Sequence, residues 1–221
     1  MKRGLLVLAA CTTRSPVAPE AWQLAQDRVV AVRATPPSLA AGEHGLVDAL
    51  IAHADGPTTV EAASVLVAAH SPLFTTVHYL FDHYELIAPD EQTLADARVQ
   101  LGLAAGEDIP LEVECDFEQF ALITDKRVLL GRHADNPVLG PIAIGGQPAG
   151  ATVVIAHDAD VALEASGGTT TRWLASCGDL DRSDQPAAVL HAGAACSGEL
   201  VVVERDATGG TVWQVWPLTV E

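Results

Sequence analysis

The chain has 221 residues, with 29 acidic against 12 basic side chains and a formal net charge of -17. Neutralising nucleic-acid phosphates takes clustered lysine and arginine, which this composition lacks, so nucleic acid is excluded as a partner and attachment to anionic lipid by charge is disfavoured. A hydrophobic fraction of 49% with 19% charged residues excludes intrinsic disorder, and no apolar run reaches the roughly 18 residues that a membrane-spanning helix needs.

The chain begins with the order of a secretory signal: two positive charges, a short apolar run and two small residues before a cysteine. The residues Leu8-Ala9-Ala10-Cys11 resemble the lipobox of bacterial lipoproteins. In that family the chain is cut before the cysteine, which carries a diacylglyceryl group and then an acyl chain such as palmitate. The resemblance implies a signal peptide over residues 1–10 and lipidation at Cys11. Because the apolar run is shorter than usual, a buried first strand ending in an ordinary cysteine is the alternative.

The segment after Cys11 is rich in Thr, Ser and Pro and has no hydrophobic periodicity. Such composition is typical of a linker, so we expect a flexible tether over residues 11–25. Lipidation at the start of the tether would attach the protein to a bacterial membrane in the cell envelope. We expect the outer membrane or the cell surface rather than the cytoplasmic membrane.

Strand patterns dominate residues 26–131, which we expect to form the first domain. Residues 28–35 and 45–53 are two apolar strands separated by Pro36-Pro37 and Gly42, and Asp55-Gly56 marks the next turn. Residues 109–118 alternate strictly between apolar and acidic side chains, which indicates a half-buried antiparallel strand. The β-rich run 119–130 follows closely, so the two predict a hairpin.

Residues 60–106 are less regular than the rest of this domain. The Ala- and Val-rich run 60–70 favours a strand. Residues 89–101 predict a short helix, because Pro89 and Asp90 suit its start and Gly102 its end.

A second set of short strands follows a linker at residues 132–134. It begins after Asn136-Pro137, and its strands are expected at 142–144, 151–156, 161–165, 170–177, 187–191, 200–204 and 212–220. Short strands separated by Gly, Pro or Asp at close spacing are the pattern of a β-sandwich, here over residues 135–221. Gly209 and Gly210 are available for positive φ in the turn before the last strand.

Several segments resemble bacterial Ig-like modules of the polycystic-kidney-disease and cadherin types. They are Val29–Pro37 with the Asp55-Gly56 turn in the first domain, and Asp160–Gly168, Arg172–Gly178 and Glu199–Gly210 in the second. The combination is similar to predicted surface lipoproteins of myxobacteria. The resemblance implies an all-β protein of two tandem Ig-like sandwiches with a helical or irregular insertion in the first, and no established activity. The Cys–Trp–Cys pattern of antibody domains is not met, because Trp173 is present but the cysteines fall elsewhere.

Lipidation of Cys11 would leave Cys115, Cys177 and Cys196. Export places them in an oxidising compartment, and Cys177 and Cys196 are the preferred disulfide because they lie close in sequence. Cys115 would then be a buried thiol in an alternating strand, or it would pair between molecules.

Two groups of residues are candidate metal sites. His78, Asp82 and His83, with Glu85 nearby, offer imidazole and carboxylate ligands for zinc, and an exposed loop is the alternative. Asp179, Asp181 and Asp184 offer oxygen ligands for calcium, although the EF-hand positions do not match and a solvated loop bracketed by the disulfide is simpler.

The pair Asp135-Asn136 is a weaker calcium candidate, since cadherin-like modules bind calcium at their junctions. We therefore expect no obligatory cofactor, with calcium or zinc as the ions to consider.

Trp213 and Trp216 are three residues apart, so on a strand they point to opposite faces. One is expected in the core, and the other could stack on a sugar ring or pack against the neighbouring domain.

Motifs of known enzyme families are missing, including the Gly-x-Ser-x-Gly elbow, His-Glu-x-x-His and the Walker loop. The sequence thus predicts a lipid-anchored envelope protein with a structural or recognition role and an envelope protein or glycan as partner. A carbohydrate-binding module that uses an exposed Trp and a metal-dependent enzyme around His78 and His83 are the alternatives.

Overall fold

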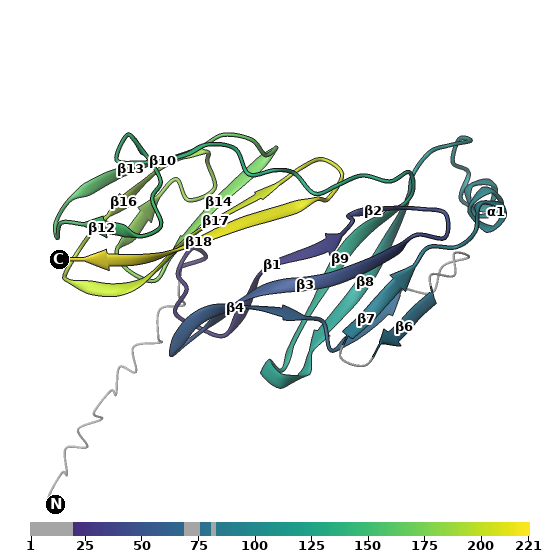
Figure 1. Cartoon of the computed structure of the whole chain (residues 1–221), viewed down its shortest axis with the longest axis horizontal. Coiled ribbons are helices and arrows are strands. Elements are labelled where there is room, and N and C mark those ends of the chain that lie inside the picture. The colour runs from purple at the N-terminus through teal and green to yellow at the C-terminus, as the bar shows by residue number, and fades with distance from the viewer. Residues whose placement is uncertain (1–19, 69–75, 81–82) are drawn as a thin grey trace, which may run out of the picture.

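The computed structural model describes residues 20–68, 76–80 and 83–221. It has two tandem β-sandwiches, each made of two facing sheets, with a short α-helix at the outer end of the first (Figure 1). The expected all-β class, with two tandem β-sandwiches and a short helix in the first, is confirmed.

The first sandwich contains a helix and strands that pair into two sheets. Its elements are β1 (Arg28–Thr35), β2 (Ser38–Ala40), β3 (His44–His53), β4 (Gly56–Ala62), β5 (Val65–Ala68), β6 (Thr76–Leu80), β7 (His83–Ile87), α1 (Glu91–Leu101), β8 (Ile109–Phe117), the 3-10 turn η1 (Glu118–Phe120) and β9 (Leu122–Gly131). One sheet has the order β1-β3-β7-β6, with β4 also paired to β3, and the other has the order β2-β9-β8-β5. The expected strand over 60–70 is divided, because β4 ends at Ala62 and β5 begins at Val65.

Helix α1 begins and ends where its capping residues predict. The Asp90 side chain accepts a hydrogen bond from the Thr93 N–H at 2.8 Å, and Gly102 ends the helix in the left-handed conformation. Leu94 and Ala97 bury one face of the helix against the core of the sandwich.

The second sandwich also contains two sheets. Its strands are β10 (Ile142–Ile144), β11 (Gln147–Pro148), β12 (Val153–Ile155), β13 (Asp160–Ala165), β14 (Thr170–Ala175), β15 (Asp179–Asp181), β16 (Ala187–His191), β17 (Cys196–Arg205) and β18 (Thr211–Val220). The sheets have the orders β11-β10-β13-β16-β15 and β12-β18-β17-β14. In both sandwiches a short early strand pairs in parallel with the last strand, β2 with β9 and β12 with β18.

Each sandwich has its own hydrophobic core. The first centres on Phe117, Leu39 and Ile51, and the second on Trp173, Leu163 and Leu200, all of which are nearly inaccessible to solvent. Alternation along β8 places the apolar residues of that strand in the first core and its acidic residues outside, as the sequence predicts.

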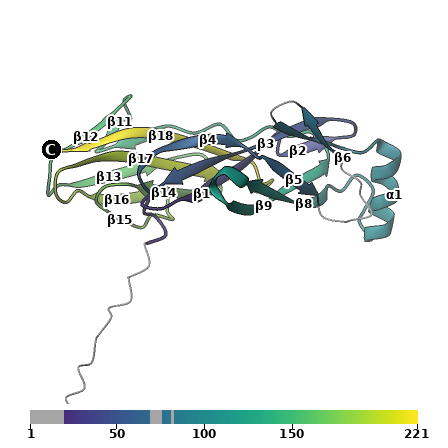
Figure 2. The same cartoon turned by 90° about the horizontal axis from the view of Figure 1, so that it is seen from below.

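The two sandwiches overlap along their length. Both views place β17 and β18 of the second sandwich beside β1 and β4 of the first (Figures 1 and 2), and β1 contacts β18 while β4 contacts β17. The short linker expected at 132–134 therefore connects two domains that pack against each other.

The last residues of the expected tether are packed against the second sandwich. Trp22 is 9% exposed and Leu24 is 5% exposed, and Gln23 forms a parallel bridge with Ala175. A tether over 11–25 is thus too long at its C-terminal end, because these apolar side chains are buried. Cys11 and the signal over residues 1–10 lie outside the described residues. Among the residues described, no helix has the length and apolar character needed to cross a membrane.

Candidate functional site at the domain junction

The junction between the sandwiches contains a third apolar layer. Leu50 and Ala52 of β3 face Leu174 of β14 and Val201 and Val203 of β17 across it. In a strand, neighbouring residues point to opposite faces, so β3 and β17 bury apolar side chains on both faces. This explains why residues 49–52 of β3 and 200–203 of β17 are continuous apolar runs where a half-buried strand would alternate.

Polar contacts close one end of this layer. The Thr58 main-chain N–H of the first sandwich donates to the Glu199 carboxylate of the second at 2.8 Å. Ser176 and Glu199 are joined twice: the Ser176 N–H donates to the Glu199 carbonyl at 2.9 Å, and the Glu199 N–H donates to Ser176 Oγ at 3.2 Å. These contacts fix the start of the Glu199 side chain.

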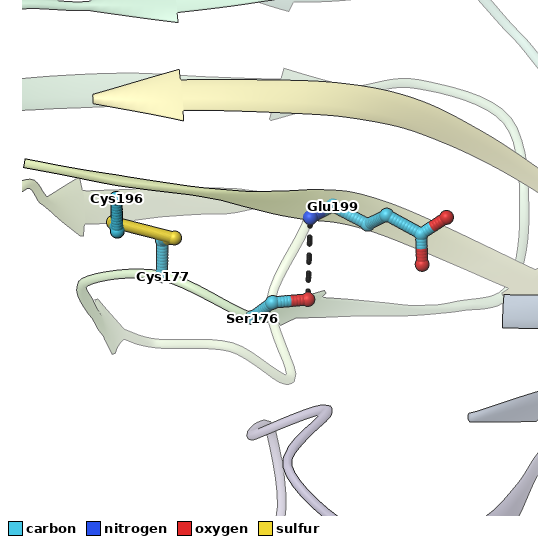
Figure 3. The surroundings of a disulfide bond; sticks show 4 residues. All are labelled: Ser176, Cys177, Cys196 and Glu199. Atoms are coloured by element: carbon cyan, nitrogen blue, oxygen red, sulfur yellow. Dashed lines mark hydrogen bonds between the residues drawn. A yellow bond between two sulfur atoms is a disulfide. The ribbon is translucent and has the colours of Figure 1, made fainter. Parts of the chain in front are cut away.

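A disulfide lies beside these contacts. Cys177 and Cys196 are bonded, as predicted, with Cα atoms 6.2 Å apart. The bond joins the end of β14 to the start of β17 next to Ser176 and Glu199 (Figure 3). It therefore braces the part of the second sandwich that reaches the first.

A cavity of about 570 Å³ opens at this end of the junction. Its walls come from both sandwiches and from the N-terminal segment: Leu24, Ala25, His53, Ala54, Asp55, Gly56, Pro57, Ser176, Ser197, Gly198, Glu199 and Pro217. We call this cavity the junction pocket. Its volume lies within the range of small-ligand sites, roughly 300–1,000 Å³, and its polar groups include two carboxylates, two hydroxyls and an imidazole.

His53 lies at the rim of the junction pocket between two polar groups. Its Nε2 is 2.9 Å from Thr59 Oγ1, and its Nδ1 is 3.8 Å from the Asp27 carboxylate, which is beyond hydrogen-bond distance. The ring also packs on Phe120, with centroids 4.9 Å apart. These contacts orient the imidazole at the end of the first sandwich.

The opposite end of the junction is held by Asn136 and Lys126. The Asn136 amide donates to the Ala34 carbonyl of β1 at 2.8 Å and accepts from the Thr211 N–H of β18 at 2.8 Å. The Lys126 ammonium of β9 donates to the Gly209 carbonyl at 2.6 Å and to Thr211 Oγ1 at 3.2 Å. Gly209 has a φ of +88° in the turn between β17 and β18, which the sequence placed here.

Asn136 therefore serves as a structural contact between the domains, and its side-chain oxygen is occupied by a main-chain N–H. Neighbouring Asp135 lies 3.3 Å from His133 Nε2, and His133 Nδ1 lies 2.6 Å from Glu43. These bonds, chiefly the one to Glu43, raise the pKa of His133. The pair considered for calcium is thus engaged within the chain.

The two tryptophans lie on opposite faces of β18, as predicted. Trp216 is 4% exposed in the core of the second sandwich. Trp213 packs against the junction layer, and the Arg33 guanidinium lies 4.2 Å from its ring centroid. Arg33 is held there by hydrogen bonds of 3.0 and 2.5 Å to Asp48. Trp216 is therefore the tryptophan expected in the core, and Trp213, which is partly buried beside Arg33, is the one to which the sugar-stacking prediction still applies.

The other candidate metal ligands lie in the β6–β7 hairpin and around β15. His78 lies opposite Glu85 in the β6–β7 hairpin, Glu85 lies 3.2 Å from His44, and Asp82 is outside the described residues. Asp179 and Asp181 flank buried Leu180 in β15, which replaces part of the expected solvated loop, and Asp184 is exposed beyond it. Among the residues described, no group of three or more His, Cys, Asp or Glu side chains is placed to hold a metal ion. The zinc site at His78, Asp82 and His83 stays a prediction.

Cys115 is the buried thiol that the alternating strand predicted. Burial raises the pKa of Cys115 to about 12, so the group is a neutral thiol at physiological pH.

Comparison with known proteins finds distant likenesses among solved structures and no family. Neither protein-family models nor curated proteins match the chain. Among solved structures, it is similar to the C-terminal fragment of intimin in complex with an intimin-binding domain, at 11% identity over 85% of this chain and with a TM-score of 0.29. The chain spans 62% of that fragment's length.

Two further similar structures are tandem modules of nearly the same length. The fibronectin(III)-like modules of Clostridium thermocellum CbhA share 13% identity over 86% of this chain and 94% of theirs, with a TM-score of 0.33. The tandem Ig repeats of Dlar share 14% identity over 86% of this chain and 97% of theirs, with a TM-score of 0.30. At values this low, the likeness does not extend to individual residues or to ligands.

The junction pocket was missed by sequence reasoning. Its walls come from five separate parts of the chain, and none of them carries a motif. The signal that could have located it is the pair of continuous apolar runs at 49–52 and 200–203, because strands buried on both faces require a further layer against them.

Proposed function

We propose that this chain is a lipid-anchored, non-catalytic recognition protein of the cell envelope that binds its partner at the junction pocket. The observation that carries the proposal is that both sandwiches contribute to the walls of the pocket while the apolar layer, the disulfide and the Glu199–Thr58 bond fix those walls in place. A preformed site loses little entropy on binding.

The chemistry of the junction pocket favours a partner with hydrogen-bond donors or a positive charge. Asp55 and Glu199 supply carboxylates, and Ser176 and Ser197 supply hydroxyls, beside the apolar surfaces of Leu24 and Pro217. We infer that the partner is an exposed loop of another envelope protein, one of whose basic side chains enters the pocket.

The anchor is the second part of the proposal. The disulfide supports an oxidising compartment, in which such bonds persist. The lipobox-like residues 8–11 support export followed by lipidation of Cys11. We place the anchor in the outer membrane or at the cell surface, the location that we expect from the resemblance of the sequence to surface lipoproteins.

Two experiments test the proposal. Mass spectrometry of the mature N-terminus should find a cleaved chain that begins with a diacylated Cys11, and an uncleaved, unmodified chain would refute the anchor. A photo-crosslinking residue at position 197, in the junction pocket, should give one discrete product in native envelopes. The matched control is position 154, on an exposed site of β12, which should give none. Equal labelling from both positions, or labelling from neither, would contradict binding at the pocket.

A further inference from the structure

The basic side chains of the described residues divide into two groups. Those with a carboxylate within 4.0 Å are Arg33, Arg98, Arg127, Arg132 and Arg182. Those with no carboxylate partner among the described residues are Arg28, Lys126, Arg172 and Arg205, and all of these line the domain junction. We call this second group the cationic seam. In a chain with 29 acidic residues, a cluster of cations without counter-charge is unexpected.

The fold brings these cations together on adjoining strands. Arg172 of β14 lies opposite Val203, and Arg205 of β17 lies opposite Thr170, so the two arginines are diagonal neighbours on the face that carries Leu174 and Val203. Diagonal neighbours in an antiparallel pair are about 7–8 Å apart. Arg28 and Arg172 also meet, because both donate to the Ala21 carbonyl, at 2.9 and 3.1 Å.

A cavity of about 190 Å³ lies at the Lys126 end of the cationic seam. It is lined by Val29, Val30, Ala31, Val32, Thr124, Asp125, Lys126 and Arg205. Strand β1 is the edge of its sheet and has a register shift between Val29 and Ala31, so its outer edge offers main-chain N–H groups that no neighbouring strand pairs. The volume is too small for a typical small-molecule ligand but suits one charged group.

Lys126 and Arg205 retain hydrogen-bonding capacity. Lys126 is 7% exposed, and its ammonium uses two of its three N–H bonds on Gly209 and Thr211. The Arg205 guanidinium has no side-chain hydrogen bond or ion pair among the described residues, and Nε and Nη2 of Arg28 are buried without a partner. Buried cations without counter-charge are costly, and a bound anion would remove that cost.

We propose that the cavity between β1, β9 and Arg205 binds one sulfate or phosphate group. Lys126 and Arg205 would contact it directly, the Thr124 hydroxyl and the edge of β1 would donate to it, and Arg172 would add positive potential from behind. Of the nearby carboxylates, Asp206 is already engaged, since it accepts from the N–H groups of Thr208 and Gly210 at 2.9 and 2.8 Å. Asp125 is exposed at the rim and leaves the centre of the cavity to the anion.

The pKa shifts of Lys126 and Arg205 agree with this geometry. Burial, followed by repulsion from Arg205, lowers the pKa of Lys126 to about 8, while Cys115 and Asp206 act in the opposite direction. Burial and then Arg172 lower the pKa of Arg205. A bound anion would raise the pKa of Lys126, so binding near pH 8 should be accompanied by uptake of protons.

The test is calorimetric titration of the full chain with sodium sulfate and sodium phosphate, with ionic strength held constant by chloride. We expect one site per chain, with proton uptake at pH 8 seen as a dependence of the heat on the buffer. Arg205→Gln and Arg172→Gln should each weaken binding, by about tenfold or more for Arg205, because hydrogen bonds to charged groups are strong. Arg182→Gln is the matched control, since this arginine pairs with Asp181 away from the seam, and it should change nothing.

The source of the anionic group is distinguished by a second arm. Full-length Cys11→Ser protein, which cannot be lipidated, is mixed with phosphatidylglycerol vesicles. Binding of the inorganic ions indicates a free anion or a small ester, whereas binding of vesicles alone, lost in Arg205→Gln, indicates a lipid headgroup. No binding in either arm, or binding that ignores both arginines, would overturn the proposal. Crosslinking from position 197 reports on the far end of the junction, so the two proposals fail separately.

Discussion

At one end of the domain junction a carboxylate of one sandwich hydrogen-bonds to the other sandwich, and at the opposite end an ammonium group does so. The Glu199 carboxylate accepts from the Thr58 N–H, and the Lys126 ammonium donates to the Gly209 carbonyl. Glu199 and Arg205 lie near the two ends of β17, a strand about 30 Å long. In each case the charged group meets a main-chain dipole rather than an opposite charge. The junction is thereby closed without ion pairs at these contacts, and each end keeps its charge available for a ligand of the opposite sign.

The apolar layer between the two ends should be the most sensitive part of the junction. Val201→Asp places a carboxylate in this layer where the residues directly opposite, Leu174 and Val215, are apolar, and burying such a charge costs several kcal/mol. We expect the sandwiches to separate, with a larger radius of gyration by small-angle scattering and two unfolding transitions in urea. Val154→Asp, at an exposed site in the same sheet, is the control and should leave both measurements unchanged.

The disulfide should stabilise the second sandwich at the end of the junction that contains the junction pocket. It closes a loop with a sequence separation of 19 residues, for which the chain-entropy model gives about 3 kcal/mol. The double variant Cys177→Ala, Cys196→Ala should lose about this much free energy of unfolding in urea. Wild-type protein under reducing conditions should match it. A variant that unfolds no more easily than the oxidised wild type would show that the loop is held by its strands without the bond.

Substitution of Asn136 tests the hydrogen bonds at the end of the junction that contains Lys126. Asn136→Ala removes a donor to Ala34 and an acceptor for Thr211, and should cost about 2 kcal/mol in urea unfolding. Asn136→Asp keeps the acceptor and loses the donor, so its cost should be intermediate. Equal costs for the two variants would mean that the bond to Thr211 contributes nothing.

The smallest expected effect is the pH dependence that Lys126 introduces. Its pKa is lowered from 10.5 to about 8 by folding, so the unfolded chain binds more protons between these values and stability rises with pH there. From pH 7 to pH 9 the gain should be about 1 kcal/mol. Above pH 9 the raised pKa of Cys115 opposes it, because the unfolded thiol ionises first. Lys126→Met should abolish the rise below pH 9, which urea titrations at each pH would measure.

Much of the fold could be predicted because its signals are local. The alternation at 109–117, the caps of α1 at Asp90 and Gly102, and the glycine turn at 209 each act within a few residues. The disulfide followed from the short separation of Cys177 and Cys196. Packing between the domains could not be predicted in this way, because the contacts of Glu199, Lys126 and Asn136 join residues 75 to 141 positions apart.

The candidate site was missed for a related reason. The contact between Trp213 and Arg33 could not be predicted, because the two residues are far apart in the chain and the sequence around Trp213 gives no sign of a cation beside its ring. The apolar runs in β3 and β17 indicate that both faces of each strand are buried. They do not indicate which element packs against the second face. The sequence places Trp22 and Leu24 in the tether, because the five residues 21–25 are too few to show a hydrophobic period.

The parallel bridge between Gln23 and Ala175 determines how the protein would carry mechanical load. The Leu24 N–H donates to the Ala175 carbonyl, and the Ala175 N–H donates to the Trp22 carbonyl, each at 3.1 Å. A pull applied at residue 20 therefore reaches β14 of the second sandwich before it reaches β1, although β1 comes first along the chain. Tension would pass first into the second sandwich, which contains the disulfide. The first sandwich would carry load only after the hydrogen bonds between residues 22–24 and Ala175 break.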